Sequence, residues 1–147
     1  MEDQQVRERN KKRELRRYRN NRSCIARLEE KLKILESRLY SIKSPNFSGM
    51  PRGGVPVSVS DLVADKEELE ERIERLKEKG KILKREILAE IDSLENSRYC
   101  EILEAYFIDG YSLEEIAENE GYNDRHVYRL YSKAISLLVL NDKNKCQ

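Results

Sequence analysis

Hydrophobic residues follow a heptad pattern in two long segments of the chain. In the first segment, apolar residues alternate steps of three and four positions without a break, and in the second the same rhythm is interrupted by Gly80. This spacing is typical of the narrow apolar seam of a coiled coil. Both segments therefore need a partner helix. The first series is Ile25, Leu28, Leu32, Leu35, Leu39 and Ile42, and the second is Leu62, Leu69, Ile73, Leu76, Leu83 and Ile87, with Ile91 and Leu94 in a shifted phase.

The connection between these segments, residues 44–60, interrupts both helices. Its sequence, SPNFSGMPRGGVPVSVS, holds all three prolines of the chain and three of its six glycines. Proline removes a backbone hydrogen bond and clashes with the preceding helical turn, so neither helix continues through it. Each flanking helix would have about 35 residues and a length of roughly 50 Å, and equal lengths predict a long antiparallel helical hairpin. Arg52, within the Met50–Gly54 loop, is a candidate for anion binding, although a tight turn accounts for the same residues.

A third helical pattern follows the hairpin. We expect the break before it at Asn96 and Ser97, with Ser97 as the N-cap residue, because such side chains favour helix starts. One continuous helix is the alternative. The apolar and aromatic residues that would share one face of this helix are Tyr99, Ile102, Leu103, Tyr106 and Phe107.

Residues 111–138 have the pattern of a helix-turn-helix. Ser112 and Glu115 have the spacing of a capping box, which predicts a helix that begins at Leu113. Ala117 is small enough for a second helix to cross closely, and Gly121 permits the positive φ of a tight turn. Asn123 is a favourable N-cap for the second helix, with Asp124 in its first turn. The apolar stripe expected on this second helix is Val127, Leu130, Ala134 and Ile135 or Leu138.

The opposite face of the second helix is basic. Arg125, Arg129 and Lys133 lie four residues apart and would line one side of the helix, as in helices that enter the major groove of DNA. A solvated basic face is the alternative interpretation. His126 would contact a base or phosphate, or be solvated near the cap. The candidate DNA-contacting residues are Asn123, Arg125, His126, Tyr128, Arg129 and Lys133.

The sequence from Tyr106 to Leu138, with the run Val127, Leu130, Lys133, Ala134 and Ile135, resembles the last conserved region of bacterial sigma factors. At the start of the second helix the chain has Asp124, Arg125 and His126, where sigma factors usually have Arg-Glu-Arg. Most of residues 25–140, including the Pro/Gly loop, more closely resembles small phage transcriptional regulators of the ArpU/RinA type. That resemblance implies activation of phage late genes. Since no separate domain for melting promoter DNA is left once the hairpin is assigned, the protein would work through RNA polymerase or on DNA alone.

Composition and charge favour elongated helices. Hydrophobic residues make up 38% of the chain and charged residues 39%, so the chain cannot bury one large globular core. Residues 1–22 hold nine Lys and Arg against four acids, whereas residues 97–147 hold six against nine. The basic segment would lie along the DNA backbone or be a solvated tail. The expected division is a basic N-terminal arm at 1–22, the hairpin at 23–96, the helix-turn-helix domain at 97–140 and a tail at 141–147.

Several other classes of function lack their sequence signals. Cys24, Cys100 and Cys146 are widely separated and odd in number, which indicates free thiols in a reducing compartment. One histidine and no closely spaced cysteine pair predict no metal site. We find no phosphate-binding loop or nucleophile motif, so neither an enzyme nor a cofactor is expected. No apolar run approaches the length of a membrane span, which predicts a cytoplasmic protein.

The sequence thus predicts an all-α protein, a long antiparallel coiled-coil hairpin followed by a three-helix helix-turn-helix domain. Its expected function is that of a sequence-specific transcriptional regulator that binds double-stranded DNA, of phage origin, and forms homo-oligomers through the hairpin. Two alternatives stay open. One is a basic-zipper-like DNA binder that uses residues 7–22. The other is a helical adaptor that docks on RNA polymerase or a phage assembly.

Overall fold

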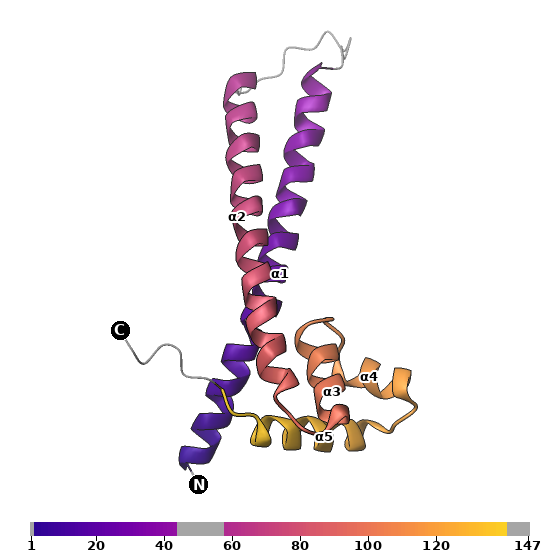
Figure 1. Ribbon diagram of the computed structural model, residues 1–147. Helices are drawn as coiled ribbons and strands as arrows, with labels where there is room; N and C mark the ends of the chain where they lie inside the picture. The colour runs from indigo at the N-terminus through magenta and orange to yellow at the C-terminus, as the bar shows by residue number, and fades with distance from the viewer. Residues whose placement is uncertain (1, 44–57, 141–147) are drawn as a thin grey trace, which may run out of the picture. The chain divides into compact units, whose positions relative to one another are not determined.

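The structure, a computed structural model, describes residues 2–43 and 58–140, and all regular structure in these ranges is helical (Figure 1). The prediction of an all-α protein is confirmed for this part of the chain. Residues 44–57 with the Met50–Gly54 loop, Cys146 and the tail at 141–147 lie outside the described ranges. The helices are α1 (Glu2–Lys43), α2 (Val59–Asp92), α3 (Ser97–Phe107), α4 (Leu113–Glu120) and α5 (Asp124–Leu137).

The described residues group into two compact units. Unit 1 contains residues 2–21 and 80–140, and unit 2 contains residues 22–43 and 58–79. This grouping differs from the division expected at residues 22 and 96. The basic N-terminal segment is helical and packs with the three short helices, because the side chain of Leu15 is buried among theirs. The last turns of α2 belong to the same unit for the same reason.

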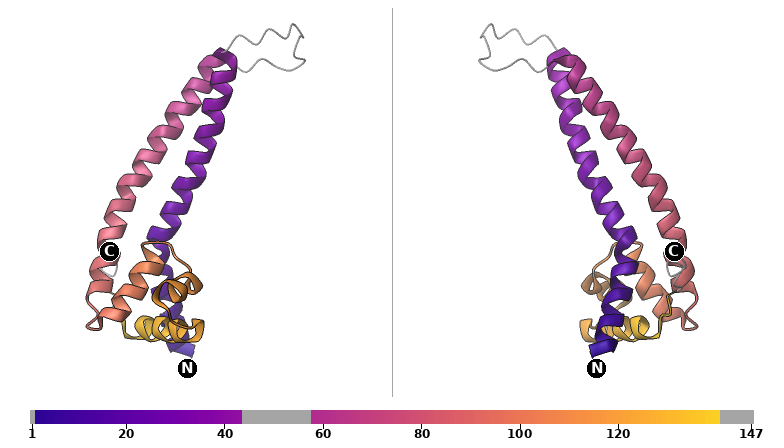
Figure 2. Two further views of the ribbon diagram at one scale, coloured as in Figure 1. Left: turned by 90° about the vertical axis from the view of Figure 1, so that its right-hand side faces the viewer. Right: turned by 90° about the vertical axis from the view of Figure 1, so that its left-hand side faces the viewer.

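Unit 1 is organised around one hydrophobic core. The short helix α5 packs on both α3 and α4, and α3 also packs on α4. Leu15 of α1 and Ile87 and Ile91 of α2 are fully buried in the same cluster as Phe107 and Val127. Both views in Figure 2 show the N-terminal turns of α1 beside the group formed by α3, α4 and α5. The core of unit 1 therefore draws on five helices.

The break between α2 and α3 has a specific local cause. Asn96, and not Ser97 as predicted, is the N-cap of α3, and its side chain accepts a hydrogen bond from the Arg98 backbone N–H at 3.0 Å. The thiol of Cys100 donates to the backbone oxygens of Ile91 and Leu94, at 3.3 and 3.4 Å. These bonds join α3 to the last turn of α2 and to the residues that follow it. Burial, with smaller contributions from neighbouring acids, raises the pKa of the Cys100 thiol.

A close approach between α1 and α2 occurs at Gly80, within unit 1. A Cβ atom on Gly80 would lie 2.5 Å from Asn21 Oδ1, which is closer than real Cβ contacts allow. Asn21 is itself buried. The interruption of the second apolar series at Gly80 therefore leaves room for a polar side chain from the facing helix.

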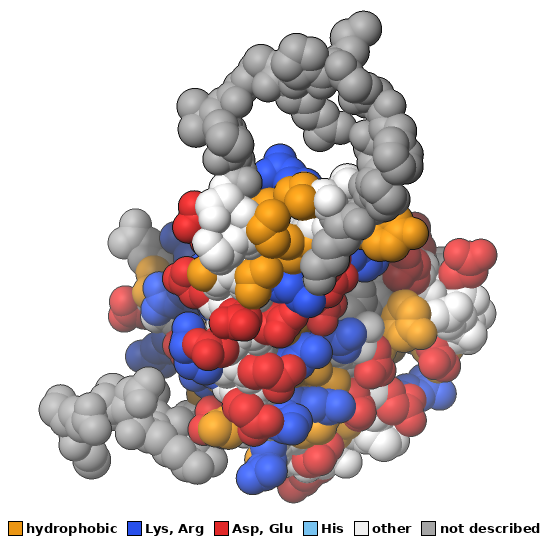
Figure 3. Space-filling model, turned by 90° about the horizontal axis from the view of Figure 1, so that it is seen from above, with side chains coloured by type: hydrophobic (Ala, Val, Ile, Leu, Met, Phe, Trp, Pro, Cys, Tyr) orange, Lys and Arg blue, Asp and Glu red, His pale blue; other side chains and the backbone are white. Residues whose placement is uncertain are grey.

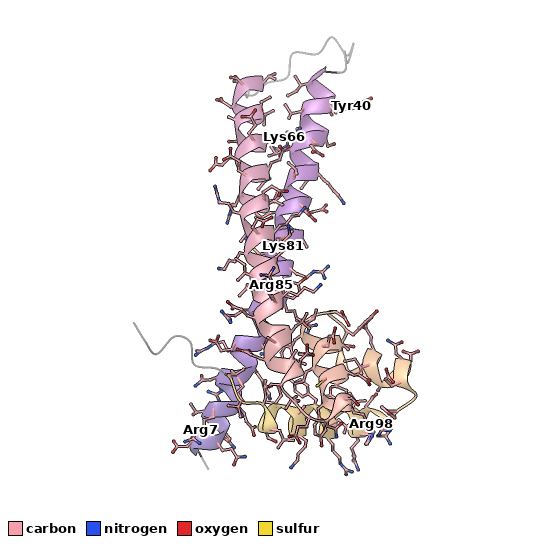
Figure 4. All side chains as sticks on the ribbon, viewed as in Figure 1. Arg7, Tyr40, Lys66, Lys81, Arg85 and Arg98 are labelled. Atoms are coloured by element: carbon pink, nitrogen blue, oxygen red, sulfur yellow. The ribbon has the colours of Figure 1, made fainter. Side chains whose placement is uncertain are left out.

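Unit 2 consists of the last part of α1 and the first part of α2. Four leucine and isoleucine side chains are buried between them, and Lys77 Nζ lies 3.5 Å from Glu29 Oε1. Lys66, labelled in Figure 4, pairs with Glu70 one turn later at 3.5 Å. Ile42, expected in the seam, is exposed. Hydrophobic side chains gather at this end of the unit in Figure 3. The buried apolar residues of unit 2 are Leu28, Leu39, Leu62 and Ile73.

Candidate functional site

The helix α4 begins with a complete capping box. The Ser112 side chain accepts a hydrogen bond from the Glu115 backbone N–H at 3.1 Å, and Glu115 Oε2 accepts one from the Ser112 N–H at 3.2 Å. Two backbone donors that the helix itself leaves without partners are satisfied in this way. The predicted start at Leu113 is confirmed. Leu113 and Ile116 are buried, so the cap also fixes which face of α4 meets the core.

A tight turn joins α4 to α5. Gly121 ends α4 with φ of +71°, a conformation that side chains with a Cβ rarely adopt. The Tyr122 N–H then donates to the Ala117 oxygen at 2.9 Å, and Ala117 is almost completely buried. Asn123 is the N-cap of α5, and its Oδ1 accepts from the His126 N–H at 2.8 Å. The positive φ of Gly121 and the N-cap role of Asn123 agree with the prediction from the sequence.

The inner face of α5 is locked into the core of unit 1. The predicted stripe is largely confirmed, although Leu130 is only half-buried. Tyr131, which was not among the residues predicted for this stripe, is buried and stacks on Phe107 with ring centroids 6.1 Å apart. Its spacing from Val127 and Ala134 was a usable signal. The fully buried residues of this face are Val127, Ala134, Ile135 and Leu138.

The outer face of α5 presents three exposed cations. Arg125, Arg129 and Lys133 line one side of the helix, and none of the ion pairs between described residues involves them. Together with Tyr128 they border a shallow depression, which Ser132 and Ser136 complete. Because the inner face of α5 is buried, these side chains project from a fixed surface. This surface can attract an anionic partner over several residues of helix length.

The other candidate residues have partners within unit 1. Asn123 holds the start of α5, and the His126 ring lies edge-to-face against Tyr122, with centroids 5.0 Å apart. The Tyr128 hydroxyl donates a hydrogen bond to Glu114. This bond is the main reason why the pKa of Glu114 is lowered and that of Tyr128 raised from their ordinary values. The structure thus brings Arg125, Arg129 and Lys133 together as free cations and gives the other three residues local contacts.

Two lysine side chains of α1, neither of them predicted to have this role, contact the C-terminal half of α5. Lys11 Nζ donates to the backbone oxygens of Ile135 and Ser136, at 3.1 and 3.2 Å. A cation at this position satisfies carbonyl groups left over by the helix and offsets the negative end of its dipole. Lys12 Nζ lies 5.6 Å from the centre of the Tyr131 ring. The apolar residue Leu15 within the basic run was the signal for this packing.

The rings of Tyr131 and Tyr106 contact each other beside cationic side chains of α1. Their rings are 5.3 Å apart in an edge-to-face arrangement, and the Arg19 guanidinium lies 4.4 Å from the Tyr106 ring centre. Burial, together with Tyr106, raises the pKa of Tyr131 to about 12, while Arg16 and Arg19 act in the opposite direction. The basic segment is therefore fixed to the aromatic part of the core through its inner side chains.

No group of three or more His, Cys, Asp or Glu side chains in residues 2–43 and 58–140 is arranged to hold a metal ion. No helix in the same ranges is both long and apolar enough to cross a membrane.

No family model, curated protein or solved structure matches the chain. The resemblance to sigma factors and to phage regulators therefore stays a prediction from the residues that carry it.

Proposed function

We propose that the protein is a sequence-specific DNA-binding transcriptional regulator, in which α4 and α5 form a helix-turn-helix and α5 enters the major groove. The observation that carries this proposal is the outer face of α5, where Arg125, Arg129 and Lys133 are exposed and have no ion-pair partner among the described residues. Arginine reads guanine through two hydrogen bonds in the major groove, and lysine contacts guanine or phosphate.

The geometry of the turn supports the same proposal. The left-handed Gly121, the buried Ala117 and the N-cap Asn123 allow α5 to follow α4 after a short turn. A recognition helix must project from a rigid support, since loose side chains lose discrimination between bases. The core contacts of α5 provide that support. Phage origin rests on the resemblance alone, and cytoplasmic location and a contact with RNA polymerase remain predictions from the sequence.

The contacts of α1 argue against the basic-zipper alternative. A basic-zipper helix enters the groove as an isolated, continuous helix. Here Leu15 is fully buried, and Lys11 and Lys12 contact α5. The inner face of the basic segment is therefore occupied by the protein's own core.

The test of DNA reading uses the α5 cations. The full chain selects duplexes from a randomised pool, and binding to a selected duplex is compared with binding to its scrambled version. Replacing Arg125 or Arg129 with Ala should cost about 1 to 3 kcal/mol of specific binding if the residue reads a base. Replacing Lys84 and Arg85, exposed cations of α2, is the matched control. Full discrimination by the Arg125→Ala/Arg129→Ala double variant would contradict the proposal.

A second proposal concerns homo-oligomerisation through unit 2. A groove on this unit has Ile34, with 49% of its surface exposed, beside the half-buried Leu35 and Leu69. Charges of both signs border it, so two copies of the same surface can pair about a two-fold axis. The charged residues that border the groove are Lys31, Arg38, Arg72, Asp65 and Glu68.

Ile34→Lys tests this dimer surface. Ile34 is not among the buried residues of unit 2, so the substitution should weaken self-association while leaving the helical content unchanged. Ile82→Lys, at an exposed position of α2 in unit 1, is the control. Light scattering over a range of concentrations measures the mass. A parent protein that stays monomeric at micromolar concentration would exclude this role and leave the role of α5 intact.

A further inference from the structure

We propose that the N-terminal turns of α1 carry a second phosphate-contact surface, which extends DNA binding beyond the C-terminal end of α5. We call this surface the α1 outer face and define it as Arg9 and Arg13. The inference rests on the proposed function of α5. It differs from the expectation of a basic arm, since the segment is an ordered helix of unit 1.

The inner side of the same turns is attached to α5. Lys11 donates to the Ile135 and Ser136 oxygens, Lys12 lies over the Tyr131 ring, and Leu15 is fully buried. Figure 1 shows these turns of α1 at the C-terminal end of α5, with α4 at its other end. Cations on this part of α1 are therefore held at a constant place relative to those on α5.

The outer side of these turns carries two exposed cations. Arg9 and Arg13 are exposed, and a step of four residues places them on one face of a helix. No ion pair between described residues involves either of them. At 1.5 Å per residue the two are roughly 6 Å apart along the helix, so each can reach its own phosphate of a DNA strand. By contrast, Arg16 is hydrogen-bonded to Tyr131, and Arg17 is paired with Glu14 and Glu86.

The opposite end of α5 is unsuited to phosphates. Helix α4, LEEIAENE, carries four glutamates, all exposed, and α5 itself begins with Asp124. Glu114 and Glu115 are held by Tyr128 and Ser112. Like charges repel the DNA backbone, so the electrostatic grip that supplies most non-specific affinity must come from elsewhere. The α1 outer face is the exposed basic surface attached at the other end of α5.

The experiment titrates the full chain against a duplex selected from a randomised pool and against its scrambled version, at several salt concentrations. The variant Arg9→Gln/Arg13→Gln removes two charges and keeps good helix formers. If both residues contact phosphates, the slope of log K against log salt should become shallower by about 2. The ratio between selected and scrambled DNA should stay at the parent value, because phosphate contacts carry no sequence information.

The control variant Lys33→Gln/Arg75→Gln removes the same charge from exposed positions of unit 2, and its slope should equal that of the parent protein. An unchanged slope for the α1 variant would overturn this inference while the α5 variants still test base reading. Equal slopes for the two double variants, both shallower than the parent, would also overturn it, since net charge alone would then explain the effect. A parent protein without salt-dependent DNA binding would overturn both proposals.

Discussion

Units 1 and 2 share the long helices α1 and α2, yet they bury apolar side chains to different degrees. In unit 1 the side chains of Leu15, Ile87 and Ile91 are fully buried among α3, α4 and α5. In unit 2 only two helical segments meet, so Leu32 and Leu35 stay half-buried and Ile34 is exposed. A two-helix seam covers one side of each apolar side chain, whereas a core of several helices encloses it. Apolar side chains at the same heptad spacing therefore contribute more to the free energy of unfolding in unit 1 than in unit 2.

The largest expected difference comes from equivalent truncations in the two units. Leu103→Ala in unit 1 should cost up to about 5 kcal/mol of the free energy of unfolding, because Leu103 is fully enclosed. Leu39→Ala in unit 2 should cost about 2 kcal/mol or less, because the open seam can close over the missing atoms. Every tyrosine except Tyr40 lies in unit 1, so tyrosine fluorescence and far-UV circular dichroism separate the two units during denaturant unfolding. Equal losses would show that the seam is as well packed as the core.

The next largest effect is a loss of stability of unit 1 at alkaline pH. The pKa of Tyr131 is raised to about 12, mainly by burial, so the folded state holds a proton that the unfolded chain loses near pH 10. Stability should be constant below pH 10 on account of this group and fall between pH 10 and about 12, by at most about 3 kcal/mol. Tyr131→Phe should remove this part of the pH dependence. Unfolding curves of both proteins across this pH range measure it, with Tyr40→Phe of unit 2 as the control; identical pH profiles for Tyr131→Phe and the parent would contradict the assignment.

A smaller effect concerns the contact between α1 and the end of α5. Lys11→Met keeps a long side chain but removes the charge and the donors to Ile135 and Ser136, which should cost about 1 kcal/mol. Hydrogen exchange should become faster in the last turn of α5. Lys33→Met in unit 2 should leave both measurements unchanged. If exchange in α5 does not respond to Lys11→Met, the contact adds nothing to the order of that helix.

The smallest effect separates helix propensity from packing at Gly80. Alanine is favoured over glycine inside a helix by about 1 kcal/mol, but its Cβ would collide with Asn21. Gly80→Ala should therefore gain less than this amount or lose stability, whereas the same change in an Asn21→Ala background should gain up to about 1 kcal/mol. A double-mutant cycle from thermal or denaturant unfolding gives the coupling. Absence of coupling would show that Asn21 moves aside without cost.

Local backbone requirements made much of unit 1 predictable. The capping box of Ser112 and Glu115, the positive φ of Gly121 and the N-cap Asn123 depend on residues within one turn of each other. A single sequence contains all the information for such features, because the groups that satisfy the backbone are neighbours in the chain. The grouping of Arg125, Arg129 and Lys133 on one side of α5 follows from helical spacing for the same reason. Their role in DNA binding is our proposal.

The tertiary structure alone decided where the basic segment lies and which residues fix α5. The bond from Lys11 to Ile135 joins residues 124 positions apart, and no local spacing specifies such a contact. Burial of Tyr131 depends on Phe107, Tyr106 and cations from α1 that meet only after the helices have packed. The charge run at residues 1–22 suggested a segment outside the core, because charge patterning does not reveal which side of a helix is covered. Helical spacing determined the elements and their faces, and long-range packing determined which faces met.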